Sequence, residues 1–270
     1  MTSWFKQLIE KRLLNCPFKQ VSQEEPLQGR QKKFFDREAE LIDIAHKIVD
    51  ENGFAGLTMD KLVAACDYSK GTVYNHFSCK EDLFIALSLT GIKYEKIILS
   101  DALKFDGNAR EIALAMNYGF QLYSRLEPTL SQCIYHAKNP AVREKCSQER
   151  IDALNAEDSD ILRMCDQAFL RGIEEGSLKL SPGLGIESFT FANWALTLGT
   201  SGLLNNGQTA QGISRIETRY ALLRNINLLY DGMQWQPLST DFDYFDTWNR
   251  LDSYFAEYLA LLEQEHATKD

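Results

Sequence analysis

Residues 53–77, GFAGLTMDKLVAACDYSKGTVYNHF, carry the clearest structural pattern in the sequence. Thr58 and Ser69 each precede a short run of residues with helical spacing, and both are residue types that favour the N-cap of a helix. Residues 66–68, Cys-Asp-Tyr, separate the two runs as a tight turn. We therefore predict two short helices joined by a three-residue turn, the helix-turn-helix arrangement, in which the second helix enters the major groove of DNA.

The flanking residues predict further helices. Apolar residues recur at three- and four-residue spacing from about Arg37, and Asn52-Gly53 closes that helix because both residues tolerate left-handed conformations. Residues 78–81, Ser-Cys-Lys-Glu, have the form of a capping box that begins a longer helix. Beyond it, helical periodicity continues, with no alternating run long enough to require a strand. The predicted class is all-α, with roughly ten or eleven helices.

Length and composition exclude several classes of protein. The chain has 270 residues, 44% hydrophobic and 25% charged, as in a soluble globular protein. We divide it into an N-terminal extension or arm (1–36), a DNA-binding domain (37–88) and a larger helical domain (89–270). Its six cysteines show no C-x-x-C spacing, which favours a reducing compartment. With no signal peptide and no transmembrane run in the sequence, we expect a cytoplasmic protein without a membrane span.

Charge is distributed unevenly along the chain. Residues 1–93 hold 13 basic and 13 acidic side chains, whereas residues 94–270 hold 16 and 25 and so carry all of the net charge of -9. An acidic body does not attract a polyanion through its general surface. Any contact with nucleic acid must therefore come from the first third of the chain.

The second short helix carries the residues suited to DNA. Ser69, Lys70, Gly71 and Thr72 supply free backbone N–H groups, a hydroxyl and room for close approach. Val73 and Phe77 face the core, which leaves the other side of the helix toward the groove. Our candidates for reading base edges are Lys70, Thr72 and Asn75, because lysine pairs with guanine and asparagine with adenine.

Residues 37–87 strongly resemble the DNA-binding domain of the TetR family of bacterial transcriptional regulators. The resemblance implies that Thr58 and Lys80 contact phosphates and that Tyr74 and His76 contact the DNA backbone. The alternative for Tyr74 and His76 is packing against neighbouring helices. The sequence departs from the family at Asp67, where a glycine is usual; aspartate visits the left-handed region at modest cost, so we expect the turn to survive.

The resemblance further implies a helical body that dimerises and encloses a small-molecule pocket. Residues 189–204 lack charged side chains and mix small with large residues, as expected of a helix between subunits, and residues 213–230 complete the predicted four-helix interface. The alternative is the core helix of a monomer. Pocket candidates are aromatic or polar side chains, although aromatics at helical spacing are more often core: Tyr118, Tyr123, Tyr135, His136, Phe169 and Trp194. Cys133 and His136 share a helix face but lack further ligands, so we predict no metal site.

Both ends of the chain extend beyond the needs of the family. An apolar stripe at Trp4, Phe5, Leu8, Ile9 and Leu13 suggests a short helix that docks on the body of this chain, on a partner or on a membrane surface. Residues 30–33, Arg-Gln-Lys-Lys, suggest a basic arm toward DNA. The tail, residues 231–270, holds 9 acidic and 2 basic side chains and predicts one last amphipathic helix.

These observations predict a TetR-like regulator that binds a palindromic DNA operator as a homodimer. They favour a ligand-responsive repressor over an activator. The alternative is a helix-turn-helix protein without a small-molecule effector, whose body binds protein partners. The sequence contains no H-E-x-x-H, Walker or G-x-S-x-G motif. We therefore predict neither enzymatic activity nor a cofactor.

Overall fold

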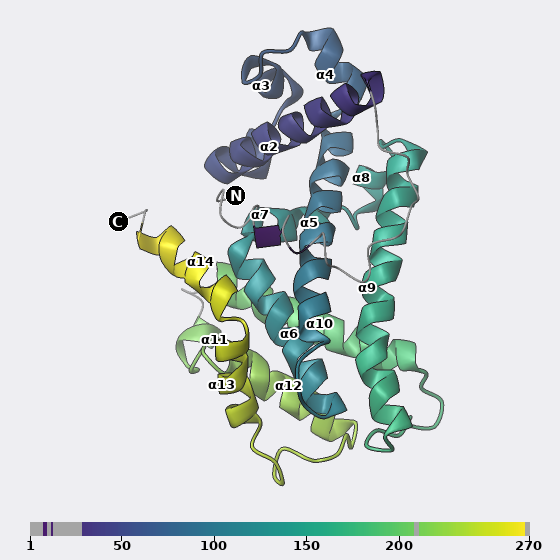
Figure 1. The fold of residues 1–270 in the computed structure, drawn as a ribbon, viewed down its shortest axis with the longest axis vertical. Helices are drawn as coiled ribbons and strands as arrows, with labels where there is room; N and C mark the ends of the chain where they lie inside the picture. The colour runs from purple at the N-terminus through teal and green to yellow at the C-terminus, as the bar shows by residue number, and fades with distance from the viewer. Residues whose placement is uncertain (1–7, 10–11, 13–28, 208–210, 268–270) are drawn as a thin grey trace. The chain divides into compact units, whose positions relative to one another are not determined.

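The computed structural model describes residues 8, 9, 12, 29–207 and 211–267, and every regular element in this part of the chain is a helix. The predicted all-α class is thus confirmed (Figure 1). In chain order the helices are α2 (Arg30–Gly56), α3 (Met59–Ala64), α4 (Lys70–His76), α5 (Lys80–Ala102), α6 (Ala109–Leu126), α7 (Pro128–His136), α8 (Pro140–Arg143), α9 (Gln148–Glu174), α10 (Ile186–Asn206), α11 (Gln211–Ser214), α12 (Ala221–Gly232), α13 (Tyr244–Tyr254) and α14 (Ala256–Ala267).

The helices form two compact units. From residue 29 onward, the described part of the first unit comprises residues 29–94 and 127–158, and that of the second comprises residues 95–126, 159–207 and 211–267. The first unit therefore contains the predicted helix-turn-helix region together with α7, α8 and the first turns of α9, which come from far along the sequence. Helices α5 and α9 each have residues in both units.

Helix α2 begins earlier than the predicted start near Arg37. The residues that we expected to form a basic arm, Arg30, Lys32 and Lys33, lie exposed in its first turns. The predicted end is confirmed, because Gly53 interrupts the helical conformation with a φ of 67°. The apolar face of α2 then packs with the other helices of the first unit, whose buried residues include Leu41, Ala45, Val49, Leu57, Leu62, Val73, Phe77, Leu83 and Leu87.

In the second unit, α6 packs against α10, α12, α13 and α14. A fully buried guanidinium, that of Arg110, joins α6 to the chain that follows α12. Its Nη1 donates to the carbonyl oxygens of Trp235 (2.6 Å) and Pro237 (3.0 Å), and its Nη2 lies 2.8 Å from a carboxylate oxygen of Asp231. Because the charge is paired and hydrogen-bonded, it is tolerated in the interior.

The two chain ends depart from expectation. The tail forms two helices, α13 and α14, instead of one, because the helical conformation is interrupted at Phe255. Phe255, Tyr258 and Leu262 are buried there. At the other end, most of the predicted apolar stripe, including Trp4, lies outside the described residues, and Ile9 is buried.

None of the helices in the described ranges is both long and apolar enough to cross a lipid bilayer.

Candidate DNA-binding surface

Helix α3 begins at a hydroxyl cap. The Oγ1 of Thr58 accepts a hydrogen bond from the backbone N–H of Lys61 at 3.2 Å, which satisfies one of the unpaired amides at the helix start. Leu62 is buried below, while Thr58 stays exposed at the surface. The predicted cap is confirmed, and its hydroxyl lies where a phosphate can reach it.

The turn after α3 forms without a left-handed aspartate. The turn survives Asp67, as expected, but Asp67 does not adopt a positive φ: Gln234 is the one non-glycine residue that does so in the part of the chain that the structure describes. Instead, Ala65 keeps a right-handed conformation, and its N–H reaches the carbonyl oxygens of Lys61 and Leu62, which tightens the helix end. Tyr68 then fixes the turn to α2 because its hydroxyl donates to Glu40 Oε2 at 2.5 Å.

Helix α4 has one buried side and one exposed side. Ser69 caps it by accepting a hydrogen bond from the N–H of Thr72 at 3.2 Å. Val73 and Phe77 are fully buried, as predicted. Because these two side chains anchor the helix in the core, Tyr74 and Asn75 on its other side are exposed to solvent.

The exposed side, which we call the α4 outer face, consists of Lys70, Gly71, Tyr74 and Asn75. The Lys70 side chain is 64% exposed, and its Nζ lies 3.1 Å from Asp60 Oδ1. That hydrogen bond raises the pKa of Lys70, so the side chain is a cation at neutral pH. A methyl group on Gly71 would meet only the Ser69 hydroxyl oxygen, at 3.9 Å, and Gly71 is exposed, so its backbone is accessible to a ligand. Thr72 is half-buried, with its hydroxyl 2.9 Å from that of Ser69.

Two residues expected to contact the DNA backbone have other partners in the structure. The His76 side chain is only 2% exposed: its ring lies 4.0 Å from that of Phe34, and its Nδ1 lies 3.4 Å from Glu38 Oε2. This corrects the expectation for His76, which faces α2. The Nζ of Lys80 donates to the Phe54 carbonyl at 2.7 Å. An ammonium has two further donors, so a phosphate contact by Lys80 stays a prediction.

The capping residue at the start of α5 also differs from the prediction. Asp82, not Glu81, accepts hydrogen bonds from the N–H (3.2 Å) and hydroxyl (3.4 Å) of Ser78. The reason is the register, since α5 begins at Lys80 and Asp82 is then its third residue. Glu81 pairs instead with Lys145 at 2.6 Å, and the hydrogen bond from Lys145 lowers the pKa of Glu81.

A cavity of about 880 Å³ lies in the second unit. At its polar side, the Tyr118 hydroxyl donates to Asp252 Oδ1 (2.6 Å), and Arg219 binds the other carboxylate oxygen (2.9 Å). Burial, aided by Asp252, raises the pKa of Tyr118, so its hydroxyl stays protonated. The lining comes from α6, α10, the chain around α11, α13 and α14: Tyr118, Gln121, Leu122, Arg125, Leu204, Asn205, Ile213, Ser214, Ile216, Thr218, Arg219, Trp248, Asp252, Leu259, Leu262 and Glu263.

Of the six predicted pocket residues, Tyr118 lines this cavity. Tyr123 and Phe169 are buried, and Phe169 packs against the ring of Trp235. Trp194 is 36% exposed on α10, and Tyr135 and His136 are exposed in the first unit. The six therefore do not form one pocket. The rest of the lining could not be predicted from the sequence, because its residues come from segments far apart in the chain.

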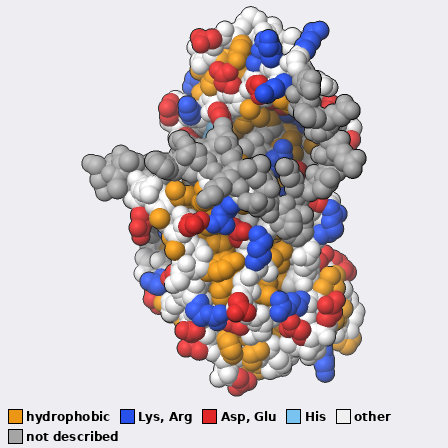
Figure 2. All heavy atoms as spheres, in the orientation of Figure 1, with side chains coloured by type: hydrophobic (Ala, Val, Ile, Leu, Met, Phe, Trp, Pro, Cys, Tyr) orange, Lys and Arg blue, Asp and Glu red, His pale blue; other side chains and the backbone are white. Residues whose placement is uncertain are grey.

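Helix α10 exposes several large apolar side chains and buries four small polar ones, although its Phe189 is buried as well. Phe191 and Leu203 are 63% and 61% exposed, and Leu228 of α12 is 74% exposed. We call Phe191, Trp194, Leu203 and Leu228 the α10–α12 apolar set. In contrast, Thr190, Thr197, Thr200 and Ser201 are buried. Figure 2 shows, on the face drawn, acidic and basic side chains interspersed with hydrophobic ones.

The first unit is similar in sequence to known regulatory proteins. Residues 41–87 match the model of the bacterial regulatory proteins of the tetR family. The HTH-type transcriptional repressor AcnR of Corynebacterium diphtheriae is 36% identical over 52 residues, which are 19% of this chain and 27% of that protein. Curated relatives of this kind are thus matched over little more than a quarter of their length.

Solved structures resemble the chain over a longer range. A protein of unknown function from Rhodococcus sp. RHA1 has a TM-score of 0.58 at 15% identity, with 78% of this chain and 99% of that chain covered. The transcriptional regulator FadR from Bacillus subtilis, solved in complex with stearoyl-CoA, has a TM-score of 0.53 at 18% identity, with 72% and 98% covered. At these identities the likeness concerns the fold.

Proposed function

Because the chain belongs to the TetR family of bacterial regulatory proteins, we propose that it is a ligand-responsive transcriptional repressor. It binds operator DNA as a homodimer, with helix α4 of each protomer in the major groove. A small molecule bound in the second unit then lowers its affinity for DNA.

The observation that carries this proposal is the two-sided construction of α4. Its inner side chains, Val73 and Phe77, are fully buried, and its outer face presents a cation, an amide, a phenol and an uncovered backbone at Gly71. Asparagine and lysine are among the side chains that read base edges in the major groove, and a capped helix start offers free N–H groups to a phosphate. Thr58 and Ser69 are exposed beside this face and complete it.

The α10–α12 apolar set supports the homodimer. Large apolar side chains that are exposed to water favour contact with an apolar partner surface. In a two-fold symmetric dimer the same patch serves both protomers, so one set of residues suffices. Two DNA-binding domains related by such an axis suit a palindromic operator whose half-sites lie about 34–36 Å apart.

The cavity in the second unit supports an effector site. Its walls combine apolar side chains, such as Leu122 and Leu259, with the guanidinium groups of Arg125 and Arg219. Pockets for small molecules typically combine an apolar lining with a few polar groups that orient the ligand. This composition suits a ligand with an apolar body and a polar or acidic end. The ligand acts by its difference in affinity between the DNA-bound and the free conformation.

Operator binding is tested by titrating the protein against DNA from upstream of its own gene at several salt concentrations. We expect tight binding that weakens steeply with salt, because phosphate contacts release counterions. Asn75→Ala should relax the preference at one base position by about 1–3 kcal/mol. Gln167→Ala, which removes an exposed amide from α9, is the control and should have no effect. Absence of binding by the unmodified protein to this DNA would contradict the proposal.

The effector site is tested with stearoyl-CoA as a first probe, followed by smaller acids with apolar chains. A ligand that binds in the cavity should weaken operator binding, and Thr218→Trp, which places a large ring at an exposed position of the lining, should remove this response while leaving operator binding intact. If the protein saturated with a bound ligand held the operator as tightly as the free protein, the repressor would not be induced through this cavity.

A further inference from the structure

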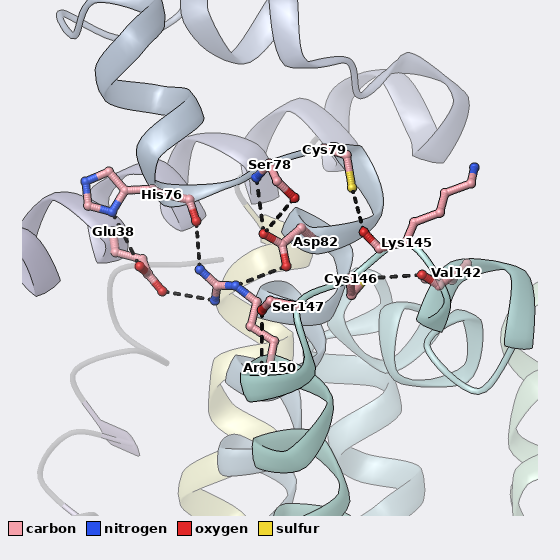
Figure 3. A network of polar contacts seen from close by, with 10 residues as sticks. All are labelled: Glu38, His76, Ser78, Cys79, Asp82, Val142, Lys145, Cys146, Ser147 and Arg150. Carbon is pink, nitrogen blue, oxygen red and sulfur yellow. Dashed lines mark hydrogen bonds and ion pairs between the residues drawn. The ribbon is translucent and has the colours of Figure 1, made fainter.

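One guanidinium joins four segments of the first unit. Arg150, in the first turn of α9, is 16% exposed in its side chain. Its Nη1 lies 3.0 Å from Glu38 Oε1 on α2, and its Nε lies 3.3 Å from Asp82 Oδ1 on α5. Its Nη2 donates to the backbone carbonyl of His76, the last residue of α4, at 2.9 Å (Figure 3).

The contact with His76 places the guanidinium at the C-terminal, negative end of the α4 helix dipole. The last carbonyl groups of a helix have no partner within the helix and carry a partial negative charge. A cation that donates to one of them both satisfies the oxygen and stabilises the helix end. The same guanidinium lies 4.8 Å from the ring centroid of Phe77, the buried anchor of α4. Arg150 thus fixes the C-terminal end of α4 at two points.

The carboxylates that hold Arg150 are themselves held by the residues around the end of α4. The second oxygen of Glu38 lies 3.4 Å from Nδ1 of His76. The second oxygen of Asp82 accepts the hydrogen bonds from Ser78, which follows α4 by two residues. Figure 3 shows the carboxylates of Glu38 and Asp82 and the backbone carbonyl of His76 pointing toward the Arg150 guanidinium from α2, α5 and α4. A shift of α4 along its axis would therefore stretch several charged contacts together.

We propose that Arg150 is a positioning residue for the recognition helix, and this inference rests on the proposed DNA-binding role of α4. Arg150 and Glu38 both lie outside the family-matched segment 41–87. The orientation of the α4 outer face is therefore set by a residue from α9 as well as by the helix-turn-helix core. Arginine suits the role because its planar guanidinium has donors in a fixed geometry, whereas a lysine ammonium is a single point.

A merely structural role and a positioning role differ in one measurable ratio. If loss of Arg150 only lowered the fraction of folded protein, the affinities for operator and for random DNA would fall by the same factor. If it misaligned α4, the operator affinity would fall much further, because phosphate contacts tolerate a shift that base contacts do not. The ratio of the two affinities is thus the readout.

The experiment compares Arg150→Gln and Arg150→Lys with Arg163→Gln as a matched control. Arg163 is on the same helix, is exposed, and pairs with Asp160 of its own helix. We expect Arg150→Gln to lower operator affinity about tenfold or more and random-DNA affinity by less than about twofold, since charged hydrogen bonds contribute about 1.5–3 kcal/mol. Arg150→Lys should fall between, and the control should match the unmodified protein.

A second measurement does not depend on DNA. Hydrogen exchange of the α4 amides should accelerate in Arg150→Gln by about tenfold, while exchange in α6 stays unchanged. An unchanged affinity ratio together with unchanged exchange in α4 would overturn the positioning role. Accelerated exchange in a protein whose unmodified form has no operator preference would instead contradict the proposed function and keep Arg150 as the residue that holds α4.

Discussion

Helices α4 and α10 have opposite relations between polarity and burial. In α4 the apolar Val73 is buried, and the polar Asn75 is exposed. In α10 the polar Thr197 is buried, and the apolar Phe191 and Leu203 are exposed. A helix with an apolar inside and a polar outside is complete in water. The reverse arrangement leaves apolar surface that water disfavours, so α10 requires an apolar partner where α4 suits a charged one.

The polar interior of α10 is consistent with this difference because Thr190, Thr197 and Thr200 have hydrogen-bond partners, whereas the buried hydroxyl of Ser201 has none among the described residues. Thr197 donates its hydroxyl hydrogen to Asn117 Oδ1 on α6, and Asn117 Nδ2 donates to the Tyr230 hydroxyl at 2.9 Å. Tyr230 in turn donates to Asn193 of α10 at 2.8 Å. Buried polar groups cost little when each has a partner. Most buried polar groups on the inner side of α10 are therefore satisfied within the protomer, and Phe191 and Leu203 are exposed and available for association.

The largest expected effect is on association through α10. In Leu203→Glu/Leu228→Glu, a symmetric dimer would bury four unpaired carboxylates, and each uncompensated buried charge costs about 3 kcal/mol or more. We expect the dimer to dissociate, with a rise in its Kd of more than about a thousandfold. Sedimentation equilibrium measures the change, and circular dichroism should show that the monomer keeps its helices.

The matched control for that variant is Leu162→Glu, which changes a leucine that is 51% exposed on α9. This change should leave the dimer intact. Dissociation in both variants would mean that exposed leucines in general, and not the α10–α12 apolar set, determine association. An unmodified protein that sediments as a monomer at high concentration would contradict the comparison itself.

The sequence predicts a helix well when the residues that determine its structure are close together in the chain, and poorly when they lie on other helices. The caps and buried residues of α4 are local, so Ser69, Val73 and Phe77 were identified from spacing alone. The absence of charge in residues 189–204 indicated a special helix, but not that Thr197 faces inward and Phe191 outward. That orientation depends on Asn117 and Tyr230, which lie on α6 and α12 and form no local pattern with α10.

The same reasoning explains the errors. His76 was assigned to the DNA side from its neighbours in sequence, whereas Glu38, Phe34 and Arg150 hold its ring and carbonyl from other helices. Long-range partners of this kind are invisible to helical spacing. The turn at Asp67 forms as expected, but a tightened end of α3 produces it, without the left-handed conformation that aspartate tolerates.

A second prediction separates stability from DNA contact within α4. Phe77→Ala removes a fully buried ring and should lower the free energy of unfolding by about 3–5 kcal/mol. Tyr74→Ala removes a ring that is 39% exposed and should change stability by less than about 0.5 kcal/mol while weakening operator binding. Urea denaturation at a fixed protomer concentration measures the stability of both variants, and the operator titration measures their DNA affinity. A large loss of stability from Tyr74→Ala would show that the Tyr74 ring packs against neighbouring helices of the DNA-binding domain instead of facing DNA.

The smallest effect tests the polar interior of α10. Thr197→Val keeps the shape of the side chain but removes the only hydroxyl that donates to Asn117 Oδ1 among the contacts of the described residues. Asn117 is 2% exposed, so its oxygen would be left buried without a donor, at a cost of about 1–3 kcal/mol. Urea denaturation of the monomeric Leu203→Glu/Leu228→Glu background isolates this cost from dimerisation, and Thr240→Val, at an exposed position, is the control. If Thr197→Val were neutral or stabilising, the buried hydroxyl would not be needed for folding, and the polarity of this side of α10 would have to serve another purpose.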